Sequence, residues 1–182
     1  GVQTCALPIL GFLLQRDPSA NDVGPKDLYR VGTAGQVVRY AGLPGGANHL
    51  MVQGERRFRV LEFLEGWPFL VASVAWIPEQ KSAGGEGGSA LEARFLQLKT
   101  QAAEAISLLP NAPDELVEVV RAIDQPGQLA DMVANLLDVK NEEKQEVLET
   151  VDLEARLDLV LKHLAKRVEV IDRKSTRLNS SH

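Results

Sequence analysis

The spacing of apolar residues along the chain changes near residues 79–89. Between residues 34 and 77, three segments rich in alternating apolar and polar residues predict antiparallel β-strands joined by turns. After residue 89, apolar residues recur every three or four positions, which predicts amphipathic helices. The pattern therefore indicates an α+β protein, with a β lobe over residues 10–78 and a helical region over residues 90–171.

The β lobe is expected to form a small barrel. Phe69–Ile77 is apolar on both alternating faces, which is typical of a strand that is covered on both sides or that closes a barrel. Gly54 interrupts the long β segment His49–Leu64 and predicts a bulge or bend there. Short antiparallel strands with turns between them favour a compact, barrel-like arrangement.

The helical region is expected to be a bundle of about five helices. Its first apolar stripe includes Leu91, Leu98 and Ile106, and its last runs along the helix that Asp152 is expected to cap. The Gly- and Ser-rich segment 79–89 before the first helix is expected to be a flexible linker.

The two ends of the chain are related at the level of DNA. Gly1–Ile9 can be encoded by GGAGTTCAGACGTGTGCTCTTCCGATC, and the reverse complement of this string encodes Asp172–Ser180 residue for residue. The string also resembles a sequencing-library adaptor. Two natural segments are not expected to be antisense translations of each other. We therefore expect residues 1–9 and 172–182 to be non-native, and the native chain to be cut at both ends.

Composition narrows the classes of function. The chain has 20 basic and 25 acidic residues, and without residues 1–9 and 172–182 these fall to 17 and 24, a net charge of −7. An acidic chain is a poor general binder of nucleic acid. The only cysteine, Cys5, lies in an excluded segment, which fits a reducing cytoplasm. No apolar run approaches the ~20 residues that cross a bilayer, so no membrane contact is expected.

No residue pattern predicts a catalytic, metal-binding or cofactor-binding site. His49 and His163 are far apart and have no ligand-spaced partners, so each is expected at the surface or in a turn. The glycines near residue 85 lack the Lys-Ser/Thr of a nucleotide-binding loop. The three arginines of Arg56–Arg59 could bind an anion, but in an acidic protein we expect them to pair with local carboxylates.

Longer phrases of the sequence resemble a known family. The first half contains DLYRVGTAGQVVRYAGLPGGANHLMVQGERRFRVLEF, and the second contains LADMVANLLDVKNEEKQEVLETVDLEARLDLVLKHL. Both resemble the N-terminal region of the Lon family of ATP-dependent proteases, in the same order. The resemblance runs from about Gly11 to Ile171. It implies a PUA-like β lobe followed by helices. Family members carry an earlier strand and helix, which are absent from this chain.

The resemblance implies a role in capturing substrates. In the Lon family this region helps to recognise unfolded or damaged proteins and contributes to hexamer organisation. ATP and Mg²⁺ would bind in an ATPase module, and a serine peptidase module would cleave; neither is present here. The chain itself is therefore expected to be non-catalytic, and its parent to be an ATP-dependent serine endopeptidase of protein quality control.

Three aromatic residues near predicted turns are candidates for substrate contact: Tyr40, Trp67 and Phe69. Exposed apolar side chains are the natural contact for an unfolded client, because folded proteins hide such groups. The alternative is that all three lie in the core.

Two other functions remain open at this point. One is a stand-alone Lon-type substrate-binding protein without ATPase or peptidase modules. The other is an RNA-binding barrel of the PUA-like type, which the acidic charge balance disfavours.

Overall fold

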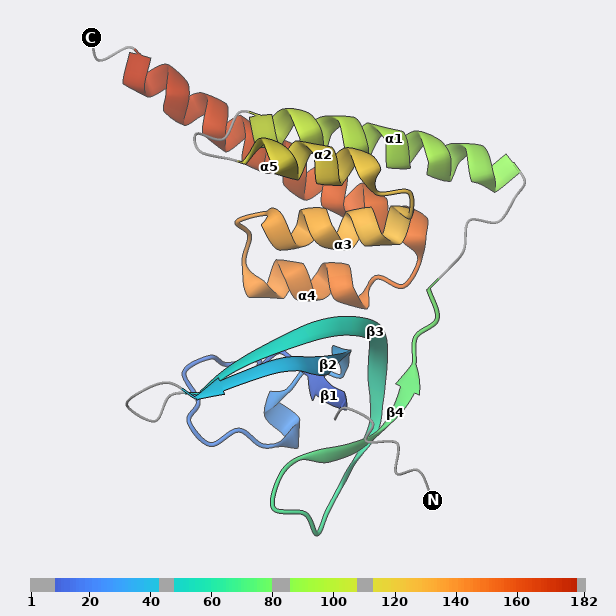
Figure 1. Cartoon of the computed structure of the whole chain (residues 1–182), viewed down its shortest axis with the longest axis vertical. Coiled ribbons are helices and arrows are strands. Elements are labelled where there is room, and N and C mark those ends of the chain that lie inside the picture. Colours follow the sequence, from blue (N-terminus) through green and yellow to red (C-terminus); the bar gives the residue numbers. More distant parts are fainter. Residues whose placement is uncertain (1–8, 43–47, 80–85, 108–112, 180–182) are drawn as a thin grey trace. The chain divides into compact units, whose positions relative to one another are not determined.

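The computed structural model describes residues 9–42, 48–79, 86–107 and 113–179 (Figure 1). The chain divides into two compact units, Gly1–Pro78 and Glu79–His182. We call them the β unit and the helical unit. The sequence LPGGAN (Leu43–Asn48) predicts a turn, and residues 43–47 of it lie outside the described residues. So do residues 80–85 of the expected linker and residues 1–8 and 180–182 of the terminal segments.

In the part of the β unit that the structure describes, four strands form an antiparallel sheet with the order β1-β2-β3-β4. Its strands are β1 (Ile9–Phe12), β2 (Val31–Gly42), β3 (Asn48–Leu64) and β4 (Val71–Trp76), and a 3₁₀ turn, η1 (Pro25–Asp27), precedes β2. The long β2–β3 pair begins at Val31↔Arg59 and ends at Gly42↔Asn48. Its register shifts beside Gly54, where the sequence predicts a bulge.

The sheet is open, so the prediction of a barrel is not confirmed. Closure would require the first and last strands to pair with each other. Among the described residues, β1 pairs only with β2 and β4 pairs only with β3. β1 covers only the four positions from Ile9↔Gln36 to Phe12↔Thr33. It includes Ile9, which falls within the segment expected to be non-native.

The core of the β unit is small. Its buried apolar cluster consists of Ala34, Phe58 and Val60 on β2 and β3, and Val31 of β2 is buried as well. Leu13, Phe63, Ala72 and Val74 pack against them and are partly buried. The remaining large apolar side chains of this unit are therefore left close to the surface.

The described residues of the helical unit form five helices, as the periodicity predicts (Figure 1). They are α1 (Glu86–Ser107), α2 (Asp114–Ala122), α3 (Pro126–Leu136), α4 (Asn141–Glu149) and α5 (Leu153–Asn179). α1 packs against α2 and α5, and α3 packs against α4 and α5. Leu98, Leu129 and Leu157 are fully buried in their shared core. None of the helices in the described ranges is long and apolar enough to cross a membrane.

The starts of α5 and α1 can be compared with what the sequence predicts. The Ala155 N–H donates to Asp152 Oδ1 at 2.8 Å, so Asp152 caps α5 as predicted. α1 begins at Glu86, inside the segment 79–89 that was expected to be a linker. The glycines there lower helix propensity but do not prevent a first turn when the following residues are strongly amphipathic.

Arg156 is the largest fully buried side chain of the helical unit, with 1% of its surface exposed. Its Nη2 lies 3.2 Å from Glu79 Oε1 and donates to the Val151 carbonyl oxygen at 3.3 Å. Its Nη1 lies 3.5 Å from Asp131 Oδ1. Arg156 therefore joins the first residue of the unit to α3 and to the α4–α5 connection.

Gly127 leaves room for one of these partners. A Cβ atom at Gly127, in the first turn of α3, would collide with Glu79 Oε1 and lie 3.0 Å from its Cδ. The glycine thus lets the Glu79 carboxylate lie against the start of α3, where the helix dipole also favours a negative charge.

We expect Arg156→Ala to lower the free energy of unfolding of the helical unit by about 3 kcal/mol, because it empties a buried site and removes both ion pairs. Urea unfolding followed by far-UV circular dichroism measures the change. Arg167→Ala is the matched control on the same helix. Its pair with Asp138 (2.7 Å) is exposed, so the loss should stay below about 1 kcal/mol. Equal losses of unfolding free energy in the two variants would contradict the structural role assigned to Arg156.

The effect of Gly127→Ala on the free energy of unfolding should depend on the residue at position 79 and should have opposite signs with glutamate and with alanine there. In the native background it displaces the Glu79 carboxylate and should destabilise the unit. In a Glu79→Ala background the clash is gone, and the better helix propensity of alanine should stabilise it by up to about 1 kcal/mol. A double-mutant cycle of unfolding free energies measures the coupling. The same effect in both backgrounds would show that Glu79 does not lie at Gly127.

Candidate functional site

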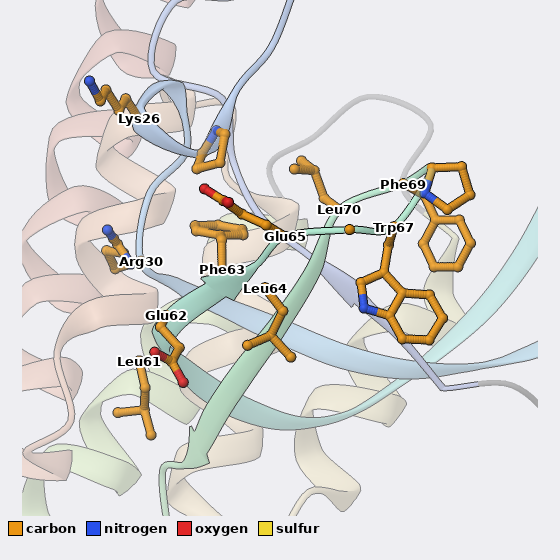
Figure 2. A pocket seen from close by; sticks show the side chains of 13 residues that line it. Lys26, Arg30, Leu61, Glu62, Phe63, Leu64, Glu65, Trp67, Phe69 and Leu70 are labelled. Carbon is orange, nitrogen blue, oxygen red and sulfur yellow. The ribbon is translucent and has the colours of Figure 1, made fainter.

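The β unit carries an open pocket of about 730 Å³ (Figure 2). One wall comes from the end of β3 and the turn that leads into β4, and the other from η1 and the residue before β2. Its lining residues are Pro25, Lys26, Arg30 and the continuous segment Leu61–Leu70. A single hairpin thus supplies most of the site.

The hairpin wall is apolar and exposed. Large side chains that would normally lie in a core are accessible to solvent here: Leu61, Leu64, Trp67, Phe69 and Leu70. Gly66 adopts a left-handed backbone conformation, with φ at 89°, which lets the chain reverse after β3. Pro68 follows and fixes the next φ angle. The turn therefore holds Trp67 and Phe69 away from the small core of the sheet.

Trp67 and Phe69 form the aromatic part of this wall. Their ring centroids are 6.1 Å apart and their planes are tilted by 40°. This separation falls in the favourable range for aromatic pairs. The pair presents a continuous apolar surface to any molecule that enters the pocket.

The opposite wall is cationic. Figure 2 shows Lys26 and Arg30 across the pocket from Trp67 and Phe69. The Arg30 guanidinium carbon lies 5.4 Å from the centroid of the Phe63 ring, a cation–π contact. Glu62 and Glu65 also line the pocket. Within the described residues none of these four charged groups forms an ion pair. The pocket lining therefore carries two positive and two negative side chains, and its net charge is zero.

The structure exposes all three residues proposed for substrate contact, so the alternative that they lie in the core is wrong. Tyr40 is 62% exposed, Trp67 59% and Phe69 66%. Trp67 and Phe69 line the same pocket, but Tyr40 does not. Tyr40 lies on β2 opposite Leu50, near the far end of the β2–β3 pair.

Sequence reasoning missed the leucines of the pocket. Phe69–Ile77 was expected to be covered on both sides, yet Leu70 and Trp76 are exposed at 51% and 44%. An apolar pattern on both faces is compatible with exposure when no second layer covers the sheet. The Gly66–Trp67–Pro68 turn was the available signal, because a tight turn keeps its neighbours out of the core.

Other candidate residues do not form a site. His49 is exposed, as expected, but His163 is buried on α5, with Nδ1 3.6 Å from Glu143 Oε1. It lies on the inner face of the helix, so the expectation of a surface position is wrong. In the described part of the chain, no cluster of three or more His, Cys, Asp or Glu residues could hold a metal ion.

The three arginines of Arg56–Arg59 do not share one exposed face. Arg57 is buried, and the Arg56 guanidinium carbon lies 4.1 Å from the centroid of the Trp76 ring. On α1, by contrast, Arg94 binds Asp158 and Glu154, and the hydrogen bond to Asp158 raises the pKa of Arg94. Arg56 thus contacts an aromatic ring, and Arg94 pairs with carboxylates of α5.

Comparison with known proteins places these features in a family. Residues 4–166 match the family described as the ATP-dependent protease La (LON) substrate-binding domain. The chain is 50% identical over 163 residues to a Lon protease of Phenylobacterium zucineum, and 43% identical over 162 residues to one of Methylocella silvestris. Each match covers 89% of this chain but only 20% of the relative, so the chain spans about a fifth of their length.

The fold is also similar to a solved structure. The N-terminal domain of the Mycobacterium avium complex Lon protease superposes with a TM-score of 0.66 at 19% sequence identity. The match covers 88% of this chain and 92% of that domain. Agreement in sequence and in fold therefore leads to one conclusion. The chain belongs to the LON substrate-binding domain family.

Proposed function

We propose that the pocket of the β unit binds exposed apolar segments of unfolded or damaged proteins, as the capture site of a Lon-type protease. One observation carries this proposal. Five large apolar side chains of a single hairpin are exposed around one pocket: Leu61, Leu64, Trp67, Phe69 and Leu70. Soluble proteins seldom expose such a group of side chains unless it binds a partner.

The energetics suit transient capture. Covering a large apolar side chain contributes about 1.5–3 kcal/mol, so a few client residues in this pocket yield several kcal/mol. Association and ordering of an unfolded segment offset much of that gain. The balance predicts weak, reversible binding, which lets a client be transferred onward. Folded proteins hide the required apolar groups and so are not captured.

The wider protein is proposed from the relatives. They are Lon proteases about five times as long as the matched region, which favours a parent with further modules over a stand-alone binding protein. We place ATP, Mg²⁺ and the serine peptidase chemistry in those modules of a cytoplasmic enzyme that assembles as a hexamer. Capture by this chain would then supply client proteins to the ATPase module of the parent protein.

Client binding should depend on the aromatic pair. We expect Trp67→Ala combined with Phe69→Ala to weaken binding of fluorescein-labelled unfolded casein at least tenfold, measured by fluorescence anisotropy. Both side chains are exposed, so thermal unfolding should change little. Tyr40→Ala is the matched control, since it removes an equally exposed aromatic outside the pocket. Equal binding by all three proteins would refute the proposed site.

The chain itself should be non-catalytic. Purified protein is expected to hydrolyse neither ATP nor casein, because no arrangement of a nucleophile and a base was identified in its sequence. Phosphate release and casein fragmentation measure the two activities. Turnover of either, retained after repeated purification, would contradict a role confined to capture.

A further inference from the structure

The chain passes from the β unit to the helical unit through Ile77, Pro78 and Glu79. Ile77 directly follows β4, and its N–H donates to the Arg57 carbonyl oxygen on β3 at 3.0 Å. This hydrogen bond fixes Ile77 to the sheet. The β unit ends one residue later, at Pro78.

Glu79 is already fixed to the helical unit. Its Oε1 lies 3.2 Å from Nη2 of Arg156, which is buried on α5. The same oxygen occupies the space beside Gly127 that a Cβ atom would need, so the carboxylate lies against the first turn of α3. The N-terminal end of that helix also favours a negative charge. A single residue thus separates a residue fixed to the sheet from a residue fixed to the helices.

Pro78 leaves this connection short and stiff. Its ring fixes its own φ angle and keeps the backbone of Ile77 out of the helical region. The Cα atoms of Ile77 and Glu79 can be at most about 7 Å apart, because each residue spans about 3.5 Å when fully extended. Rotation about a few backbone bonds remains, but the length of the connection does not change.

The glycine-rich segment 80–85 has a different place in the chain. It connects Glu79 to α1, and both belong to the helical unit. It therefore adds no length between the two units while Glu79 stays paired with Arg156. If the pair opened, residues 78–85 would all separate the sheet from α1. A flexible Gly- and Ser-rich chain of about eight residues has a root-mean-square length of about 15 Å.

We propose that the Glu79–Arg156 ion pair is a latch that sets the length of chain between the two units. The inference goes beyond the proposed function, because it holds whatever the pocket binds. Loss of Glu79 leaves the buried Arg156 cation with Asp131 as its remaining carboxylate partner among the described residues, which favours the closed latch. A short connection also keeps each unit at a high effective concentration near the other.

The test inserts the same sequence, Gly-Gly-Ser-Gly-Gly-Ser, at two places in the full chain. One insertion lies between Ile77 and Pro78, and the other follows Gly84. The rotational correlation time of each unit is measured by ¹⁵N relaxation. The insertion at Ile77 should shorten both times towards about half, because each unit has roughly half of the mass and a flexible linker lets the two tumble separately. The insertion after Gly84 should leave both times close to those of the native chain.

Glu79→Ala tests the latch itself. Its correlation times should shorten as they do with the insertion at Ile77, because Pro78 and the glycine-rich segment then form one longer connection. Asp138→Ala is the matched control. It removes another carboxylate of the helical unit that pairs with an arginine of α5, Arg167 at 2.7 Å, and should leave the correlation times unchanged. Far-UV circular dichroism checks that the helices are retained.

Equal shortening by the two insertions would place the joint in the glycine-rich segment and overturn the proposal. The proposal also fails if the native units already tumble as freely as those of the Ile77 insertion, or if Glu79→Ala keeps its helices and tumbles like the native chain. If Glu79→Ala loses its helices, the two insertions decide alone. None of these measurements involves a client, so the proposed capture site stands or falls separately.

Discussion

The small core of the β unit lies where β3 is paired with β2 on one side and with β4 on the other. Phe58 and Val60 are enclosed with Ala34 near the Val31↔Arg59 end of the β2–β3 pair, where β4 also pairs with β3. Beyond Val31↔Arg59, β3 pairs only with β4 among the described residues. Leu61 and Leu64, in this part of β3, are exposed and line the pocket.

The helical unit is stabilised in a different way. Its core is a continuous apolar cluster, so it does not depend on main-chain pairing between distant segments. Within that cluster Arg156 is buried, and its Nε and Nη1 atoms make no hydrogen bond within the described residues. Burying a cation is costly unless ion pairs offset the loss of water. Glu79 and Asp131, about half exposed, provide that compensation while keeping their outer faces hydrated.

The sequence predicts the helices better than the sheet, for a physical reason. A helix forms its own hydrogen bonds, so the stripe through Leu157, Val160 and Leu164 and the cap at Asp152 are enough to define α5. A strand depends on residues far away in the chain. Alternation in Phe69–Ile77 shows that both faces are apolar, but it does not show whether anything covers them. That is why the barrel was not confirmed, and why the exposure of Leu70 was missed.

The same distinction explains which parts of the site were predictable. Trp67 and Phe69 were identified because they lie in and directly after the predicted turn Gly66–Trp67–Pro68, a local feature. Tyr40 met the same criterion but lies at the other end of the long hairpin, which only the strand register reveals. The prediction for His163 was wrong because a polar residue next to an apolar stripe on a helix can face either the core or the solvent. Its Nδ1 lies 3.6 Å from Oε1 of Glu143 on α4, a neighbour that no spacing along α5 encodes.

The exposure of five large apolar residues to water lowers the stability of the β unit relative to a fold that buries them. Among the described residues, the Leu61–Leu64 edge of β3 beside this apolar wall pairs with no further strand, and an edge of that kind favours pairing between copies of the chain. Three features of this edge oppose that outcome: the bulge at Leu61 interrupts the ladder, Lys26 and Arg30 place charges across it, and its length is only four residues. These features limit pairing between copies of the chain along this edge. The balance between accessibility and self-association thus follows from the same short stretch of β3 that forms the pocket.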